Sequence, residues 1–275
     1  MNTKSFRIRV NRNTENAKIR QTWGLGVLLF LIFISAGVAA ESQPIEMLTF
    51  QYPPYANGDG TGMGEEIVAA AFQTQGHSVK FTLYPIKRAI SNFQEGQGKM
   101  FLGLRDFFSE QEINAEEIFY FRRVLIYLKD QYPELHINSL DDLKGKKIGV
   151  VLGSSQIVDF QTAGLVVDKT SKHENNIKKL YARRVDVIYT LDLTGTSLIE
   201  KLFPGQPADF EIFEYQRNAA DLVVRKNSFG DKILQTFRTG LKTIIENGTY
   251  HKIMEQSYGA GQVPASAQVK SSEIK

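Results

Sequence analysis

A glycine-rich loop near the start of the chain raises the first chemical question. Residues 52–72 read YPPYANGDGTGMGEEIVAAAF, with glycines at the alternate positions 58, 60, 62 and 64. A dinucleotide-binding loop requires Gly-x-Gly-x-x-Gly directly between a strand and a helix, which this spacing does not provide. A calcium loop counted from Asn57 needs a glutamate at its twelfth position, where the chain has Val68. The remaining interpretation is a turn whose glycines permit positive φ before a helix.

A second polar stretch is the better candidate for binding an anion. Gly153, Ser154 and Ser155 follow the apolar segment 147–152. At the carboxyl end of a strand, the backbone amides and hydroxyls that open a helix can point into a cleft and suit a carboxylate. Plain capping of that helix uses the same residues. Both interpretations stay open.

Aromatic and cationic side chains complete one side of the predicted site. Tyr52 and Tyr55 can form an aromatic wall of a small-ligand pocket, with core packing beside two prolines as the alternative. Arg88 and Arg105 can each pair with an anion through a bidentate guanidinium, with solvent exposure or a structural ion pair as the alternative. The aromatic run 119–121 can line a cleft floor or pack against the core.

Asp192 is the candidate partner for a cationic group. It follows a segment, 185–191, with the apolar composition of a buried strand. The same carboxylate can instead cap the helix that residues 194–203 predict.

Catalytic and metal motifs are not found in the sequence. The four histidines are scattered, no His-x-x-x-His pair occurs, and no Gly-x-Ser-x-Gly elbow is present (His77, His136, His173 and His251). We therefore predict no metal, no cofactor and no catalytic residue, and we expect the histidines at the surface.

The N-terminus has the pattern of a secretory signal peptide. Six Lys or Arg residues and one acid precede an apolar or small stretch, 23–40, which ends in SAGVAA. We expect cleavage after Ala40 and a periplasmic protein, with an uncleaved anchor as the alternative. Without residues 1–40 the 33 basic and 30 acidic residues become 27 and 29, so no nucleic-acid partner is indicated. With no cysteine, stability must come from apolar burial.

Strands and helices are expected to alternate along the chain, which indicates crossover units and largely parallel sheets. Strands are expected at 45–52, 78–84, 100–104, 123–129, 147–152, 185–191 and 222–225. Helices are expected at 63–75, 85–95, 139–143, 175–183, 194–203, 233–245 and 250–257. The segment after Gly259 lacks periodicity, and we expect it to be disordered.

The order of these segments resembles that of family 3 periplasmic solute-binding proteins, the amino-acid-type receptors of ABC importers. Four stretches carry the resemblance: YPPY with its glycine turn, SLDDLKGKKIGV at 139–150, RVDVI at 184–188 and NGTYHKI at 247–253. The resemblance implies a two-lobed, type II periplasmic binding protein fold of the α/β class, in which two crossover strands act as a hinge around a ligand. Segments 123–129 and 222–225 match those crossovers.

Together with the signal-peptide pattern and the unpatterned C-terminal segment, the resemblance gives the domain boundaries. The signal peptide is 1–40, the discontinuous first lobe is 41–124 with 225–259, the second lobe is 125–224, and the tail is 260–275. Two departures from the family concern the ligand. Gln111 stands where amino-acid receptors carry a carboxylate-binding arginine, and Leu191 stands where they carry an aspartate for the ligand's ammonium, with Asp192 one place later. A shift of one residue in a strand turns the side chain to the other face, although at the end of a strand Asp192 can still reach the cleft.

The resemblance predicts a monomeric receptor that captures a small polar solute, such as an amino acid or a related carboxylate, for an inner-membrane permease. Two alternatives stay open. One is a ligand-sensing subunit that acts on a membrane signalling protein, and the other is a periplasmic enzyme of the cyclohexadienyl dehydratase type. Such an enzyme needs a cleft carboxylate as acid or base.

Overall fold

The computed structural model describes residues 43–154 and 156–274 of the chain. Residues 44–275 form one compact unit. The predicted signal peptide lies outside the described residues. Within the described part, no helix has the length and apolar character needed to cross a membrane.

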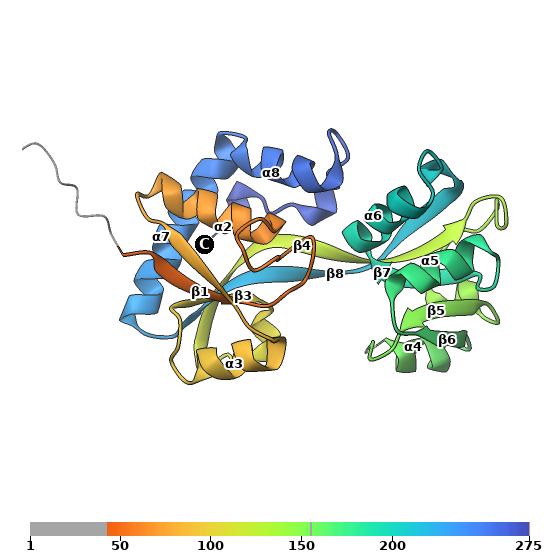
Figure 1. Ribbon diagram of the computed structural model, residues 1–275, viewed down its shortest axis with the longest axis horizontal. Coiled ribbons are helices and arrows are strands. Elements are labelled where there is room, and N and C mark those ends of the chain that lie inside the picture. The colour runs from red at the N-terminus through yellow and green to blue at the C-terminus, as the bar shows by residue number, and fades with distance from the viewer. Residues whose placement is uncertain (1–42, 155, 275) are drawn as a thin grey trace, which may run out of the picture. The chain divides into compact units, whose positions relative to one another are not determined.

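One mixed sheet of eight strands runs through residues 44–275, in the order β2-β1-β3-β8-β4-β7-β5-β6 (Figure 1). The pairs β1–β2, β1–β3, β5–β6 and β5–β7 are parallel, whereas β3–β8, β4–β8 and β4–β7 are antiparallel. The strands are β1 Ile45–Thr49, β2 Val79–Leu83, β3 Met100–Gly103, β4 Ile113–Leu128, β5 Lys147–Val151, β6 Val166–Thr170, β7 Val187–Leu191 and β8 Phe210–Arg225.

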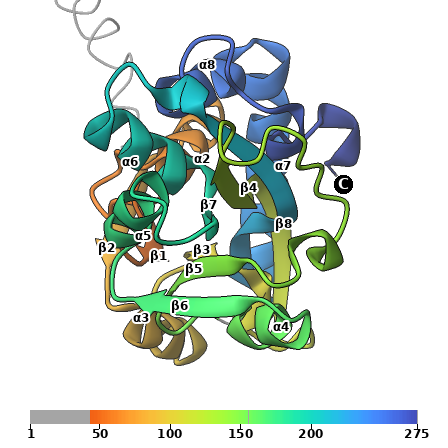
Figure 2. The ribbon, with the colours of Figure 1, turned by 90° about the vertical axis from the view of Figure 1, so that its right-hand side faces the viewer.

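Helices cover both faces of the sheet at each of its ends. They are α2 Met63–Thr74, α3 Ile86–Gln94, α4 Ile157–Thr162, α5 His173–Tyr181, α6 Asp192–Leu202, α7 Ser228–Glu246 and α8 Thr249–Tyr258. We call the group β1–β3 with α2, α3, α7 and α8 lobe 1, and the group β5–β7 with α4, α5 and α6 lobe 2. Figure 2 shows β5 and β6 side by side in lobe 2.

Alternation along the strands explains why each lobe has two cores. In lobe 1, Met47 packs with α2, α7 and α8, whereas its neighbour Leu48 packs with α3 on the opposite face. In lobe 2, Leu125 packs with α4, whereas its neighbour Val124 packs with α5 and α6. Successive side chains of a strand point to opposite faces, so apolar residues at consecutive positions require helices on both sides.

The strands β4 and β8 connect the two lobes. The first half of β4 pairs with the end of β8 beside β3, and its second half pairs with the start of β8 and with β7 (Figure 1). The pairing shifts register between Glu117 and Phe119 and again between Arg123 and Val124. The expected crossovers 123–129 and 222–225 are therefore confirmed as parts of strands, but each strand is 16 residues long. The remaining residues of β4 and β8 include many charged and polar side chains, so they form no apolar run that would predict a strand.

The C-terminal segment is ordered, which corrects the expectation of a disordered tail from residue 260. Two short 3-10 turns, Ala265–Ala267 and Ser271–Glu273, pack on β4 and α7. Ala267, Val269 and Ile274 are buried in the large core of lobe 1. These anchors have neither helical nor strand spacing, so periodicity could not reveal them.

Candidate functional site

The glycine-rich loop forms an anion cradle that the chain's own Glu65 fills. The amides of Asn57, Gly58, Gly60 and Gly62 donate to the Glu65 carboxylate at 3.2, 2.8, 3.1 and 3.1 Å. Glu65 is fully buried. A run of backbone amides converging on one carboxylate is a typical anion nest. The predicted turn is thus confirmed, and its anion-binding groups serve the fold.

The same loop positions Tyr55. The amides of Met63 and Gly64, at the start of α2, donate to the carbonyls of Pro54 and Tyr55 at 3.0 and 2.9 Å. The Tyr55 ring then lies parallel to the Phe119 ring, with an interplanar angle of 6° and a centroid distance of 5.7 Å. The Tyr52 ring also stacks on the Tyr55 ring, with a centroid distance of 5.9 Å. Lobe 1 therefore presents an aromatic stack that starts at the crossover β4.

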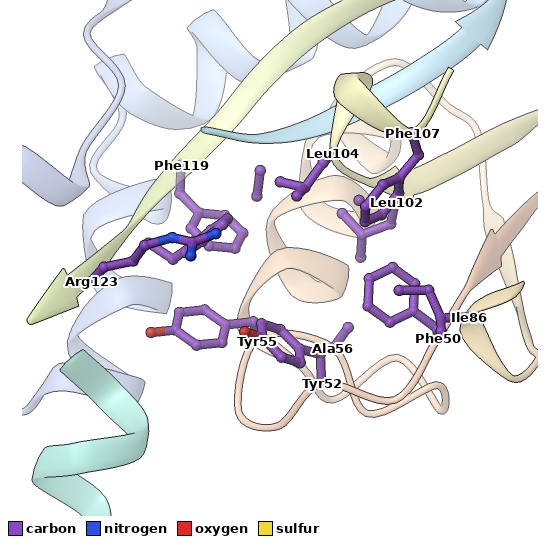
Figure 3. Close-up of a pocket in the computed structure, with 13 residues that line it drawn as sticks. Phe50, Tyr52, Tyr55, Ala56, Ile86, Leu102, Leu104, Phe107, Phe119 and Arg123 are labelled. Carbon is purple, nitrogen blue, oxygen red and sulfur yellow. The ribbon is translucent and has the colours of Figure 1, made fainter. Parts of the chain in front are cut away.

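This stack borders a cavity of about 180 Å³, which we call the apolar cavity (Figure 3). Arg123, labelled in Figure 3, is the charged residue of the lining. The lining residues are Phe50, Tyr52, Tyr55, Ala56, Ile86, Leu102, Gly103, Leu104, Phe107, Phe119, Phe121, Arg123 and Ala220. The arrangement suits a flat apolar group with a polar end directed at Arg123.

A second cavity of about 320 Å³, which we call the polar cavity, opens on the lobe 2 side. It is lined by Tyr52, Arg123, Val151, Leu152, Gly153, Ser154, Gln156, His173, Tyr189, Thr190 and Leu191. Tyr52 and Arg123 line both cavities. The two cavities are therefore neighbours at the crossover, with residues of both lobes around them.

Arg123 has an unusual set of partners. Its Nε donates to the side-chain oxygen of Asn218 at 2.8 Å, and its Nη1 donates to the Tyr189 hydroxyl at 2.9 Å. The guanidinium carbon lies 5.9 Å from the Phe121 ring centroid. Among the described residues, no carboxylate forms an ion pair with it. All its partners are neutral, so its positive charge is not compensated within the described chain.

His173 lies at the first position of α5 and is half-buried, which corrects the expectation of a surface histidine. Its Nδ1 and the Thr190 hydroxyl form a hydrogen bond of 3.0 Å. Burial lowers the pKa of His173 below its ordinary value. The imidazole therefore enters the polar cavity as a neutral group near pH 7.

Tyr52, Gly153 and Ser154 come together at the polar cavity, and Tyr55 lines the apolar one. Tyr52 is 41% exposed, and burial of its hydroxyl raises its pKa, an effect that Arg123 partly offsets. Ser155 lies outside the described residues. The helix that follows, α4, starts only at Ile157 and has six residues, so its dipole gives little support to the anion-binding interpretation of Gly153 and Ser154.

Both predicted arginines lie elsewhere. Arg105 donates from Nη2 to Asp221 at 2.5 Å and to Glu117 at 3.3 Å, and the Asp221 interaction raises its pKa. Arg88 is exposed on α3 and lines neither cavity. Gln111, at the position of the family's arginine, is exposed and contacts Ser109. These placements match the structural alternatives stated for both arginines.

Asp192 is 1% exposed and is fully engaged by the chain. Its Oδ1 accepts from the Tyr55 hydroxyl at 2.5 Å and from the Leu193 amide at 2.8 Å. Its Oδ2 accepts from Arg122 and from the Tyr258 hydroxyl, both at 2.8 Å. It lines neither the apolar nor the polar cavity, whereas Leu191 lines the latter. The shift of one position has turned the carboxylate away, as the alternation of side chains predicts.

Sequence reasoning missed Arg123, His173, Thr190, Phe50 and Phe107. Phe119 and Phe121, from the aromatic run that it proposed for a cleft floor, do line the apolar cavity. Arg123 was recognised only as the charged start of a predicted strand. Its position in the segment 123–129, which was expected to cross between the lobes, could have indicated a binding role. A cation in such a segment lies beside the cleft.

No protein-family model matches the chain, and no curated protein matches it. Solved structures match its fold. The L-cystine solute receptor of Neisseria gonorrhoeae, in an unliganded open conformation, has 20% identity, covers 80% of this chain and 95% of its own, and has a TM-score of 0.63. The second substrate-binding domain of a putative amino-acid ABC transporter from Streptococcus pneumoniae has 19% identity, coverage of 78% and 99%, and a TM-score of 0.60. A histidine kinase sensor domain similar to periplasmic binding proteins has 18% identity, coverage of 80% and 97%, and a TM-score of 0.56.

These likenesses show the fold: the chain has the α/β fold of periplasmic binding proteins, as we predicted. The neighbours that the comparison names as amino-acid receptors of ABC transporters share that fold.

Proposed function

We propose that the protein is an extracytoplasmic solute-binding protein that delivers a small solute to an ABC-type importer. One observation carries this proposal: Tyr52 of lobe 1, Ser154 and Thr190 of lobe 2, and Arg123 of the crossover surround one cavity. The fold supports it, because two solved neighbours are named as an L-cystine receptor and an amino-acid transporter domain. The signal-peptide pattern supports export of the chain.

The arrangement supports capture by hinge closure. A ligand that touches both lobes gains its second set of contacts only when the lobes approach each other, so it stabilises the closed state. The long strands β4 and β8 are the connections about which such a movement turns. The groups proposed to bind the ligand are Tyr52, Tyr55, Gly153 and Ser154 from the sequence prediction, and Arg123, His173 and Thr190 from the structure.

Binding without chemical conversion fits the cavities better than a dehydratase reaction does. A carboxylate acid or base must reach the reacting atom. No described Asp or Glu lines the apolar or the polar cavity. Asp192, one of the acids that such an enzyme could use, already accepts four hydrogen bonds.

A ligand-sensing role is the second candidate function, and a specific neighbour favours it. The histidine kinase sensor domain shows that this fold occurs in a signalling protein. Such a role predicts the same ligand-induced closure but a different membrane partner. Co-purification of the ligand-loaded protein with a permease supports import, whereas co-purification with a signalling protein supports sensing.

A ligand screen tests the proposal directly. Residues 41–275 are purified, freed of bound solutes by unfolding and refolding, and heated with amino acids and small carboxylates. A ligand at 100 times its dissociation constant raises the free energy of unfolding by about 2.7 kcal/mol. We expect saturable stabilisation by at least one solute and a smaller radius of gyration in solution scattering. A protein that no solute stabilises or compacts would contradict the proposal.

A further inference from the structure

The two neighbouring cavities differ in chemistry, which restricts the ligand. We propose that the ligand carries an apolar ring and a carboxylate and lacks an ammonium group. The ring occupies the apolar cavity, and Arg123 binds the carboxylate where the two cavities meet. This inference rests on the proposed binding function and specifies its ligand class.

The apolar cavity has the size of a single ring. Its volume is about 180 Å³, and an engineered protein cavity of about 150 Å³ holds a benzene molecule. Tyr55 and Phe119 stack in parallel along its wall, and Phe50 and Phe107 lie 6.2 Å apart at an interplanar angle of 61°. Aromatic walls of this kind bind a ring through its face and its edge. A long flexible aliphatic solute would leave these contacts incomplete.

The charge of Arg123 indicates an anionic group on the ligand. Arg105 and Arg122, on nearby elements, are each paired with a buried aspartate. Arg123 contacts only Asn218, Tyr189 and the Phe121 ring among the described residues. A half-buried guanidinium without a counter-charge is costly, and a ligand carboxylate can supply that charge. The described residues form hydrogen bonds with its Nε and Nη1 and none with its Nη2, so the N–H groups of Nη2 are available to a ligand carboxylate.

The lack of acids in the cavities argues against an ammonium group. The side chains that line the two cavities include no Asp or Glu in the described part of the chain. Asp192 is the nearest equivalent of the family's ammonium partner, and Tyr55, Tyr258, Arg122 and the Leu193 amide occupy both its oxygens. An α-amino acid would bury its cation near Arg123 without an acidic partner, and the two like charges would repel.

Three probes that share a phenylethyl group test this specificity. The probes are 3-phenylpropanoate, L-phenylalanine, which adds an ammonium group, and phenethylamine, which has the ammonium but no carboxylate. Titration calorimetry of residues 41–275 at pH 7 should give an affinity for 3-phenylpropanoate at least about 10-fold higher than for L-phenylalanine. Phenethylamine should bind more weakly than either.

The outcomes separate this inference from the proposed function. Tighter binding of L-phenylalanine or phenethylamine overturns the inference and leaves the receptor function intact. The same holds if none of the three binds at millimolar concentration while another solute of the wider screen does. If no solute of that screen binds at all, the receptor function fails.

Variants assign the roles of the residues. Arg123→Gln should weaken 3-phenylpropanoate binding by about 10- to 100-fold, because it removes a charge-assisted hydrogen bond. Arg88→Gln, which changes an exposed arginine outside both cavities, is the matched control and should leave the affinity unchanged. An Arg123→Gln protein that folds and binds normally would overturn the assignment.

A second variant covers the case in which Arg123→Gln does not fold. Tyr52 is 41% exposed and lines both cavities, so Tyr52→Ala should preserve the fold. We expect it to weaken 3-phenylpropanoate binding by about 5-fold or more, through loss of an aromatic contact. Unchanged affinity in a folded Tyr52→Ala protein would contradict the placement of the ligand.

Discussion

The Tyr55 hydroxyl donates a hydrogen bond of 2.5 Å to Asp192, and this bond joins the turn after β1 to the first residue of α6. Tyr55 belongs to lobe 1 and Asp192 to lobe 2. The Tyr258 hydroxyl of α8 reaches the other oxygen of the same carboxylate, so two groups of lobe 1 hold one acid of lobe 2. The negative charge of Asp192 raises the pKa of Tyr258 well above its ordinary value, after the larger effect of burial. These hydrogen bonds therefore connect lobe 1 to lobe 2 beside the strands β4 and β8.

Removal of the Tyr55 hydroxyl should weaken this connection between the lobes and lower the stability of the protein. Tyr55→Phe keeps the ring stack on Phe119 and deletes one hydrogen bond to a charged acceptor, so we expect a loss of about 1.5–3 kcal/mol in the free energy of unfolding. Urea denaturation measures it. Tyr181→Phe, which removes an exposed hydroxyl bonded to Gln206, should change the stability by less than about 0.5 kcal/mol. Equal stabilities of the two variants would show that the bond to Asp192 contributes little.

The cradle of Glu65 provides a second prediction. In Glu65→Gln the carboxylate becomes an amide, which offers one oxygen and places an N–H group against backbone donors. We expect a loss of about 2–3 kcal/mol in the free energy of unfolding, because several bonds to a charged acceptor are weakened. The aromatic near-UV circular dichroism should also change, since the loop holds Tyr55.

Glu66→Gln is the matched control for Glu65→Gln. Glu66 lies one position later in α2, and burial together with the charge of Glu65 raises its pKa. Neutralising Glu66 therefore costs little, and we expect a change within about 0.5 kcal/mol. A Glu65→Gln protein as stable as Glu66→Gln would mean that the four amides find equivalent partners in water.

The contact between α2 and α7 gives a third prediction. A Cβ atom on Gly240 would lie 2.1 Å from the carbonyl oxygen of Ala71, so the two helices approach each other at this glycine. Gly240→Ala should destabilise the protein by about 1–3 kcal/mol through overpacking, despite the better helix propensity of alanine. Thr239→Ala, at the exposed neighbouring position, gains propensity without a clash and should be neutral or slightly stabilising. Thermal unfolding of both variants measures the difference.

Local patterns in the sequence were sufficient for much of the fold. The strand β1, the glycine turn and α2 were predicted in the correct order, because strand alternation, helical spacing and glycine signals lie close together in the chain. The positions of β4 and β8 were found only in part. Their remaining residues pair with each other across about 100 positions of sequence, and such pairing leaves no local apolar signal.

The binding residues were harder to predict for the same reason. Tyr52 and Ser154 could be proposed, since each follows a recognisable strand. The environment of Arg123 depends on Tyr189 and Asn218, which are 66 and 95 residues away. The roles of Arg105 and Asp192 likewise depend on distant partners, Asp221 and Tyr55. The residue type of an arginine or aspartate is visible in the sequence, whereas its pairing is decided by the folded chain.

The stability of the protein should depend on pH through His173. Burial lowers the pKa of this imidazole in the folded state below its ordinary value of 6.5, and its place at the start of α5 also disfavours protonation. The unfolded chain therefore binds more protons below that value. By linkage, the stability contributed by neutral His173 is fully present above pH 6.5 and is lost as the pH falls towards the folded-state pKa.

We therefore expect the free energy of unfolding to decrease between pH 7 and pH 5, and His173→Gln to reduce the slope of this decrease. His136→Gln is the matched control, because His136 is exposed, and it should leave the slope unchanged. Urea denaturation at half-unit pH intervals measures the three slopes. If the stability of His173→Gln falls with pH as steeply as that of the unmodified protein, other groups cause the difference in proton binding between the folded and unfolded states. That result would contradict the assignment of a neutral imidazole to the polar cavity.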